Sequence, residues 1–249
     1  MPDLYAVIGG SGLYGLDDGF RLEQSLTPDT PYGKPSAPLV TGWWQDKRVV
    51  FLARHGQSHS VAPHLINYRA NLWALHQAGV SHIIAVNAVG GITAELAPQT
   101  IALPDQIIDY SSGREQSFLD GGHLALDHID FTFPYSQEIR ANLIKAAKAQ
   151  GIHLIDTGTY GCTNGPRLET KAEVVKLKQD GCTMVGMTGM PEAALARELK
   201  IEYASIALVV NWCAGIDDSI VSMDEIKLAL TQGMDTVKKL ICATLAQVS

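Results

Sequence analysis

Two kinds of hydrophobic pattern alternate along the chain. Short, almost continuously apolar runs are typical of strands that are covered on both faces. They occupy residues 5–10, 48–53, 82–87, 100–110, 153–161, 183–187 and 201–211. Between them, apolar side chains recur at helical spacing. These segments are residues 64–79, 136–151, 170–181, 190–200 and 222–247. The alternation predicts an α/β fold with a central mixed β-sheet flanked by helices.

Two segments carry neither pattern. Residues 28–38 are rich in proline, and residues 111–136 form a connection that is too long for an ordinary loop. Loops of that length are usually functional or pack against another subunit. Gly79 and Gly151 directly follow two of the helical patterns, which is a typical helix stop. Because no repeat or linker divides the chain, we expect residues 1–249 to form a single domain.

Composition and charge narrow the function classes. The chain has 249 residues, a net charge of -7 and 46% hydrophobic residues. An acidic balance argues against a nucleic-acid-binding surface, although backbone amides can still hold a small anion. No apolar run approaches the ~18 residues of a membrane span. The first residues lack the basic leader of a signal peptide, so we expect a cytoplasmic protein.

The four cysteines point to the same compartment. Cys162, Cys182, Cys213 and Cys242 lie far apart and form no C-x-x-C pair. Neither a disulfide framework nor a zinc site is therefore expected. Reduced thiols are the ordinary state of cysteines in a cytoplasmic protein.

Candidate chemistry gathers where the predicted strands end. In open α/β sheets, ligands bind beyond the carboxyl ends of the strands. Five of these ends carry small and polar residues: GGSG (9–12), ARHG (53–56), NAVGG (87–91), GMTGMPE (186–192) and NWCAG (211–215). Each segment alone is unspecific, but together they predict one composite site.

Several of these residue types suit an anion. Glycine amides around Ser11 can cradle a phosphate, although a tight structural turn explains the same residues. The spacing does not fit the G-x-G-x-x-G pattern of a dinucleotide site. Arg54 and His55 offer donors for phosphate oxygens. His55 and His59 are four residues apart, which suggests a metal, but the ligand set is incomplete.

Two further strand ends add donors and an apolar surface. Asn87 and Thr188 carry polar groups that can donate to an anion. Met187 either lies under a sugar face or is ordinary core filler.

Glu169 stands beside a predicted helix start. Thr170 and Glu173 have the spacing of a capping box, which places Glu169 just outside the helix. Its carboxylate is then either a solvated acid near a positive helix end or a group that contacts a ligand. The residues alone leave both readings open.

An ordered set of motifs resembles a known family. The set comprises IGGSGL, ARHG, NYRANLWAL, VNAVGG, GREQSF, GPRLET, GMTGMPEA and VVN, and it covers nearly the whole chain. It is similar to the trimeric nucleoside phosphorylases, which include methylthioadenosine phosphorylase and the low-mass purine nucleoside phosphorylases. The resemblance implies a homotrimer that takes phosphate as co-substrate and needs no metal or organic cofactor.

The resemblance also implies roles for individual residues. The implied phosphate-binding residues are Ser11, Arg54, His55, Asn87, Ala88 and Thr188, of which Asn87 stands where the methylthioadenosine enzymes have threonine. The implied contacts to the nucleoside are Val89, Gly90, Leu168, Glu169, Met187, Asn211, Met223 and Ile226. His128 is expected to reach a neighbouring subunit's site near the 5′ end of the substrate. Asn211, Ser11 and Arg54 are the implied catalytic residues.

The implied reaction is phosphorolysis, in which phosphate attacks the ribosyl C1′ while the bond to the purine breaks. Its transition state resembles an oxocarbenium ion. The protein must place phosphate beneath the sugar and stabilise negative charge that arrives on the base. Neither task needs a covalent nucleophile.

The details of the resemblance predict the substrate. Glu169 accepts a hydrogen bond from N1–H of a 6-oxopurine, and Asn211 donates to its N7 and O6; the methylthioadenosine enzymes resemble Ser and Asp at these positions. Met223 and Ile226 make the 5′ side apolar. Together these features indicate S-methyl-5′-thioinosine. A broader purine nucleoside or methylthioadenosine phosphorylase remains an alternative, as does a silent nucleotide-binding module, because fold does not fix function.

Overall fold

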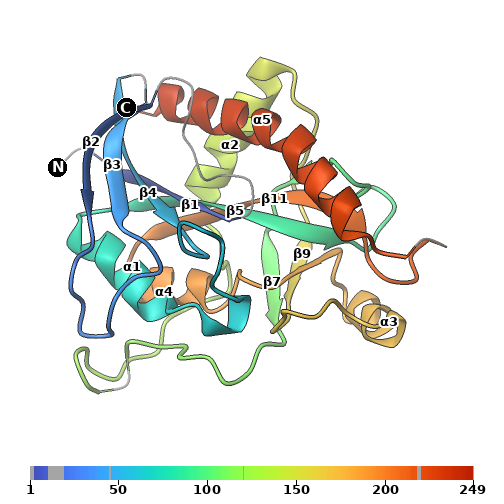
Figure 1. The fold of residues 1–249 in the computed structure, drawn as a ribbon, viewed down its shortest axis with the longest axis horizontal. Helices are drawn as coiled ribbons and strands as arrows, with labels where there is room; N and C mark the ends of the chain where they lie inside the picture. Colours follow the sequence, from blue (N-terminus) through green and yellow to red (C-terminus); the bar gives the residue numbers. More distant parts are fainter. Residues whose placement is uncertain (1–2, 11–19, 45, 120, 218–219, 249) are drawn as a thin grey trace.

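The computed structural model describes residues 3–10, 20–44, 46–119, 121–217 and 220–248, and it is organised around one mixed sheet (Figure 1). Hydrogen-bonded neighbours run in the order β2-β3-β4-β1-β5-β10-β9-β7, and β11, β6 and β8 branch from β5. The strands are β1 (Tyr5–Gly9), β2 (Phe20–Leu26), β3 (Leu39–Trp44), β4 (Lys47–Ala53), β5 (His82–Gly91), β6 (Ile101–Ala102), β7 (Gln106–Asp109), β8 (Leu154–Ile155), β9 (Thr159–Cys162), β10 (Met184–Gly186) and β11 (Glu202–Trp212).

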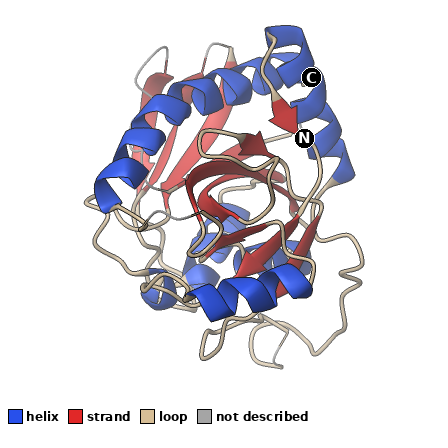
Figure 2. Ribbon diagram, turned by 90° about the vertical axis from the view of Figure 1, so that its right-hand side faces the viewer, coloured by secondary structure: helices blue, strands red, loops and turns tan. Residues whose placement is uncertain are grey.

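Helices cover both faces of this sheet. They are α1 (Tyr68–Gln77), α2 (Gln137–Gln150), α3 (Lys171–Gln179), α4 (Glu192–Glu198) and α5 (Met223–Gln247), with a short 3-10 helix at Pro63–Leu65. Figure 1 shows α2 and α5 on one face and α1 and α4 on the other, with α3 at one end. Figure 2 shows the strongly curved sheet between these helices. The predicted single-domain α/β fold with a mixed sheet is confirmed.

The strands that were predicted from apolar runs are the buried ones. All five residues of β1 are buried, and so are eight consecutive residues of β11, Tyr203–Val210. The single strand predicted at residues 100–110 is wrong, because it divides into β6 and β7 around Pro104, which has no backbone N–H for a ladder. The strand predicted at 153–161 likewise divides into β8 and β9.

The strand prediction missed β2 and β3, because neither contains a continuous apolar run. Six of the seven residues of β2 are exposed, and β2 is an edge strand that pairs with β3 alone. β3 begins at Leu39 and contains buried and half-buried residues, but Thr41 and Gly42 interrupt its apolar positions. The antiparallel ladder joins β2 to β3 and β3 to β4, and Leu39 and Trp44 of β3 also pack into the core.

The predicted helix ends agree with local chemistry. Thr170 caps α3 by accepting a hydrogen bond from the Glu173 amide, and the Glu173 carboxylate accepts one from the Thr170 amide, as in a capping box. Gly151 ends α2 with a φ of 64°, a left-handed conformation that glycine adopts without strain. Among the described residues, no helix combines the length and apolarity that a membrane crossing needs.

The sheet opens at its centre, and this opening positions the site. β5 pairs with β1 through Ala85 and with β10 only from Gly90 onward, while β11 follows it on the other side. The residues between, 86–89, therefore lack a strand partner on one edge. The carboxyl ends of β1, β4, β10 and β11 converge around this gap.

Candidate functional site

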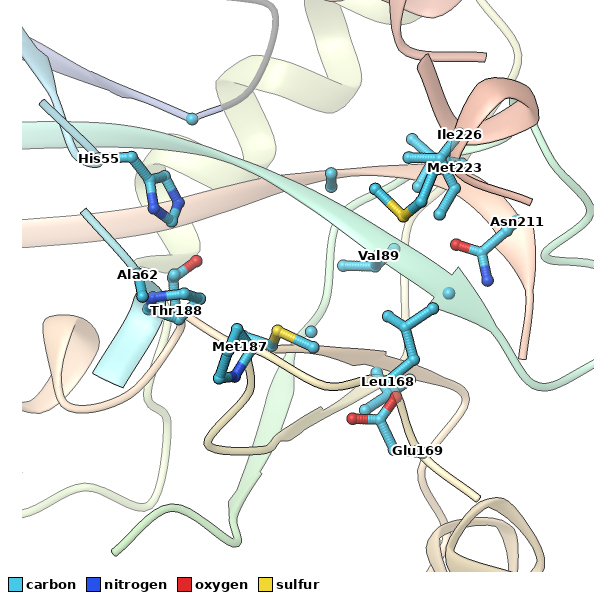
Figure 3. Close-up of a pocket in the computed structure, with 18 of the residues that line it drawn as sticks. His55, Ala62, Val89, Leu168, Glu169, Met187, Thr188, Asn211, Met223 and Ile226 are labelled. Carbon is cyan, nitrogen blue, oxygen red and sulfur yellow. The ribbon is translucent and has the colours of Figure 1, made fainter. Parts of the chain in front are cut away.

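A cavity of about 470 Å³ lies at the converging strand ends. Its wall combines polar and apolar residues from β5, β10 and β11, from the loops that follow β1, β4, β9, β10 and β11, and from α5. They include Gly10, Arg54, His55, His59, Ala62, Ala88, Val89, Gly90, Leu168, Glu169, Met187, Thr188, Asn211, Cys213, Met223 and Ile226. Figure 3 shows His55 and Thr188 at one end, Glu169 and Asn211 at the other, and Val89 and Met187 between them.

Arg54 supplies a fully buried positive charge at the first end. Its side chain is 1% exposed, and its Nε and Nη2 donate to the two Glu192 oxygens at 2.7 and 2.8 Å. Tyr203 donates to Glu192 at 2.8 Å, and Arg54 Nη1 donates to the Val86 carbonyl at 2.9 Å. Burial alone would lower the pKa of Arg54, but the Glu192 carboxylate outweighs burial and raises it. The guanidinium is thus charged and held in one orientation.

His55 stands next to this charge in its neutral form. Its Nδ1 lies 2.9 Å from the Val61 carbonyl oxygen. Burial, and then the positive charge of Arg54, lower the pKa of His55 to about 4. At neutral pH the ring therefore carries no charge, so it can offer hydrogen bonds to the cavity but not a positive charge.

Thr188 faces the cavity and is held from behind by Asn87. The Asn87 amide donates to the Thr188 hydroxyl at 2.7 Å, and Ser205 donates to the Asn87 carbonyl at 2.8 Å. Asn87 is 2% exposed and does not line the cavity. Its side chain orients Thr188 with one N–H, and its oxygen is engaged by Ser205.

The turn that carries Met187 and Thr188 rests on Tyr160. A Cβ at Gly186 would lie 2.1 Å from the Tyr160 hydroxyl, and one at Gly189 would lie 3.1 Å from its ring. A side chain at position 186 would therefore displace the Tyr160 ring, and one at position 189 would press on this ring and on Ile107.

Arg114, from the long connection 111–136, ties the neighbouring loops together. Its Nη2 donates to the carbonyls of Thr163, Asn164 and Met187 at 3.2, 3.0 and 2.9 Å, and its Nη1 donates to Met190. The loops after β9 and β10 are therefore fixed relative to each other, and with them the two sides of the cavity.

Glu169 faces the cavity rather than capping α3. Thr163 donates to its Oε1 at 2.7 Å, and the capping box engages Glu173 instead. Its carboxylate keeps further lone pairs for a ligand. The geometry thus favours ligand contact over the alternative of a solvated acid at a helix end.

A β-bulge aims Asn211 at the same end. Val209 pairs with Val89 and Asn211 with Gly90, so Val210 is the extra residue. The Asn211 amide donates to the Trp212 carbonyl at 2.7 Å, which leaves one N–H and the side-chain oxygen. Glycine is needed at position 90, since a Cβ there would lie 2.6 Å from the Cys213 sulfur.

Cys213 itself is not a nucleophile at neutral pH. Burial, and then the neighbouring Glu169 charge, raise the pKa of its thiol above the ordinary range. The cavity therefore offers hydrogen-bonding groups and a buried cation but no thiolate.

The remaining wall is apolar and open. Met223 and Ile226, from the first turn of α5, line the cavity together with Leu168. Met223 is 60% exposed and Leu168 is 41% exposed. This part of the wall lies at the mouth of the cavity and is not packed into the core.

The structure brings most of the predicted residues together. Arg54, His55, Ala88, Val89, Gly90, Leu168, Glu169, Met187, Thr188, Asn211, Met223 and Ile226 all line the cavity. Ser11 lies outside the described residues. Asn87 lies behind the wall, and His128 is exposed on the long connection, away from the cavity of its own chain.

Sequence reasoning missed the supporting residues. Glu192 and Arg114 do not contact the cavity directly, and their partners are far away in the chain: 138 residues separate Arg54 from Glu192. The wall segment from His59 to Pro63 and Cys213 were also missed. Of these residues, only Glu192 is conspicuous in the sequence, because it places a charge within the largely apolar segment GMTGMPEA.

The histidine pair does not form part of a metal cluster. The rings of His55 and His59 have centroids 4.5 Å apart. Among the described residues, no group of three His, Cys, Asp or Glu side chains is arranged to hold a metal ion.

Comparison with known proteins shows the family of the chain. Residues 4–246 match the model of the Phosphorylase superfamily. A probable S-methyl-5′-thioinosine phosphorylase of Pseudomonas syringae is 51% identical over 98% of both chains. A 6-oxopurine nucleoside phosphorylase of Pyrococcus furiosus is 42% identical over 98% of this chain and 92% of its own.

Solved structures agree as well. The methylthioadenosine phosphorylase from Schistosoma mansoni in complex with adenine has a TM-score of 0.91 and is 31% identical, over 99% of this chain and 91% of its own. The family model, the similar sequences and the similar structures agree over nearly the whole chain, so the chain belongs to the phosphorylase superfamily.

Proposed function

We propose that this protein cleaves S-methyl-5′-thioinosine with phosphate, giving hypoxanthine and S-methyl-5-thioribose 1-phosphate. The observation that carries the proposal is one cavity with three chemically different regions. Arg54, His55 and Thr188 suit an anion, Glu169 and Asn211 suit a 6-oxopurine edge, and Met223 with Ile226 suits an apolar 5′ group. The relatives named for methylthioinosine at 47–51% identity support the same substrate.

In the proposed mechanism, phosphate lies beside Arg54 and Thr188 and attacks C1′ as the bond to the base breaks. Positioning accounts for much of the rate enhancement. Asn211 stabilises the negative charge that develops on the purine by donating its free N–H. Glu169 accepts N1–H, which a 6-oxopurine carries and adenine lacks. No residue forms a covalent intermediate, and no metal or organic cofactor takes part.

The assay that tests this proposal measures purine release with and without phosphate. We expect phosphate-dependent hypoxanthine release from S-methyl-5′-thioinosine, slower release from inosine, and still slower adenine release from S-methyl-5′-thioadenosine. Equal or faster adenine release would identify a methylthioadenosine phosphorylase instead. Failure to release any purine would favour a silent nucleotide-binding module.

We propose further that the protein is a cytoplasmic homotrimer in which Ser11 contacts phosphate and His128 reaches the 5′ end of a neighbour's substrate. The open wall at Leu168 and Met223 supports a contribution from another subunit, and His128 is exposed in the single chain. Light scattering measures the assembly. A fully active monomer would contradict this part of the proposal.

A further inference from the structure

His55 is fixed in one tautomer by a backbone contact. Its Nδ1 lies 2.9 Å from the Val61 carbonyl oxygen. A carbonyl oxygen only accepts hydrogen bonds, so Nδ1 carries the ring proton. In a neutral imidazole the second nitrogen, Nε2, then has a lone pair and no hydrogen. No described residue hydrogen-bonds to Nε2, and the ring borders the cavity.

The groups around this lone pair are donors. An arginine has five N–H groups, and three of those of Arg54 are directed at Glu192 and Val86. Within the described part of the chain the other two have no recorded acceptor and can donate to a ligand. Thr188 accepts from Asn87, which leaves its hydroxyl hydrogen free to point elsewhere. Among the described side chains of Arg54, His55 and Thr188, the unused groups are thus several donors and one acceptor, Nε2 of His55.

Nearby charges keep His55 in the accepting form. Arg54 is the charged neighbour, and it opposes protonation of the ring. Glu192, whose negative charge would favour protonation, is already engaged by Arg54 and Tyr203. The other titratable neighbour is His59, and burial lowers its pKa as well.

We propose that His55 accepts a hydrogen bond from a protonated oxygen of the bound anion, and that it thereby selects hydrogen-bearing oxyanions such as HPO₄²⁻ and HAsO₄²⁻ over sulfate. This inference rests on the proposed function, in which phosphate is the co-substrate. HPO₄²⁻ brings the required proton. Sulfate has the same shape and charge but no proton, so one of its oxygens would face the lone pair of His55. Sulfate then binds only if His55 takes a proton from solvent.

Isothermal titration calorimetry of the unmodified protein tests this selection. At about pH 8, phosphate and sulfate are titrated separately in two buffers of different ionisation enthalpy. We expect phosphate to bind at least about 100-fold more tightly, since sites built around a hydroxyl strongly reject analogues that lack it. We also expect sulfate, but not phosphate, to take up close to one proton. Affinities within tenfold of each other, without proton uptake, would overturn the inference.

Two variants of His55 assign the effect to Nε2. His55→Gln extends an amide to the place of Nε2, where it can donate as well as accept. The phosphate preference should then fall below about tenfold, and proton uptake with sulfate should disappear. His55→Asn is the matched control, because its shorter amide reaches only the Val61 carbonyl. It should lose the proton uptake without acquiring tight sulfate binding. If His55→Gln keeps the parent preference and proton uptake, another group is the acceptor and the inference is wrong.

The inference and the proposed function fail in different experiments. If phosphate supports purine release while sulfate competes equally well, only the role of His55 as acceptor is wrong. If phosphate binds with the expected preference but no purine is released, only the proposed reaction is wrong. Absence of phosphate binding would overturn both.

Discussion

At the anion end of the cavity, Arg54, His55 and Thr188 are 1%, 8% and 7% exposed, whereas Leu168 and Met223 at the nucleoside end are 41% and 60% exposed. The first group is held by a buried ion pair, a backbone carbonyl and a side-chain amide. The second group has few neighbours to hold it. The same cavity therefore joins a rigid half to an open half.

This difference in burial suggests that recognition of the anion and recognition of the nucleoside depend on different parts of the fold. Phosphate is common to every phosphorolysis, and the residues proposed to bind it lie in the core, where a change of residue also disturbs folding. The nucleoside end lies at the surface, where substitutions usually cost little stability. Such an arrangement lets substrate preference change while the anion site stays fixed. The relatives named for methylthioinosine, 6-oxopurine nucleosides and methylthioadenosine are consistent with that division.

The largest expected effect is at the buried ion pair. Glu192→Gln leaves the charge of Arg54 uncompensated at 1% exposure, and removing one partner of a buried pair costs about 3–5 kcal/mol. Denaturant unfolding measures the loss, and phosphate affinity should fall as well. The matched control is Glu23→Gln, which breaks the surface pair with Arg48, where both side chains are 41% exposed. That pair should contribute less than about 1 kcal/mol. Equal losses in the two variants would contradict the contrast between core and surface.

The second expected effect is a dependence of stability on pH that belongs to His55. Unfolded histidine takes a proton below its ordinary pKa of 6.5, whereas burial keeps folded His55 neutral down to about 4. The unfolded state is therefore favoured increasingly as the pH falls between these values. The slope is at most about 1.4 kcal/mol per pH unit. No such loss arises above pH 6.5.

Comparison with His55→Gln isolates this contribution from that of the carboxylates. Free energies of unfolding at several pH values between about 4 and 8 should converge for the two proteins as the pH falls. Parallel curves would show that His55 is not buried as a neutral ring.

The same contrast explains what sequence could predict. Strands β1, β4 and β11 are buried, so apolar runs revealed them, and their ends located Arg54, His55 and Asn211. The exposed edge strand β2 lacks that signal. A strand that is buried on both faces is rich in apolar residues, whereas an exposed edge strand, which is held by backbone hydrogen bonds, needs no such composition.

Partners distant in the chain were beyond the reach of any local pattern. Asn87 was assigned to the anion by its place after a strand, yet it lies behind Thr188, 101 residues away in sequence. The bulge at Val210 determines which way the Asn211 side chain faces. The apolar sequence of β11 does not predict this bulge. Residue types and strand ends are local properties, but the orientation of a side chain depends on the packing around it.

The third prediction concerns Asn211, which is proposed to contact the purine base. Asn211→Asp should slow hypoxanthine release by roughly 10²-fold, because a carboxylate would face both the Trp212 carbonyl and the O6 of the base without a hydrogen to donate. Adenine release should fall less, since a protonated Asp can donate to N7. Steady-state rates with both nucleosides measure the ratio. If both rates fall by the same factor, Asn211 supports the loop and does not recognise the base.

The smallest expected effect concerns the apolar 5′ wall. Met223→His replaces a thioether with a polar ring, which should favour the 5′-hydroxyl of inosine over a methylthio group. A small apolar group in a pocket is worth about 1–3 kcal/mol, so we expect the ratio of kcat/KM for the two substrates to shift by roughly tenfold toward inosine. Stability should change by less than about 0.5 kcal/mol, because Met223 is 60% exposed and packs little.

Leu228→His is the matched control for this change. It lies on the same helix, is 58% exposed and does not line the cavity. The control should leave the substrate ratio unchanged, and melting temperatures should show that both variants fold. A shift in the control as large as that in Met223→His would point to a general effect on α5. An unchanged ratio in both variants would place 5′ recognition outside this wall, and His128 of a neighbouring subunit would then be the next residue to change, because it offers a polar partner that the apolar wall does not.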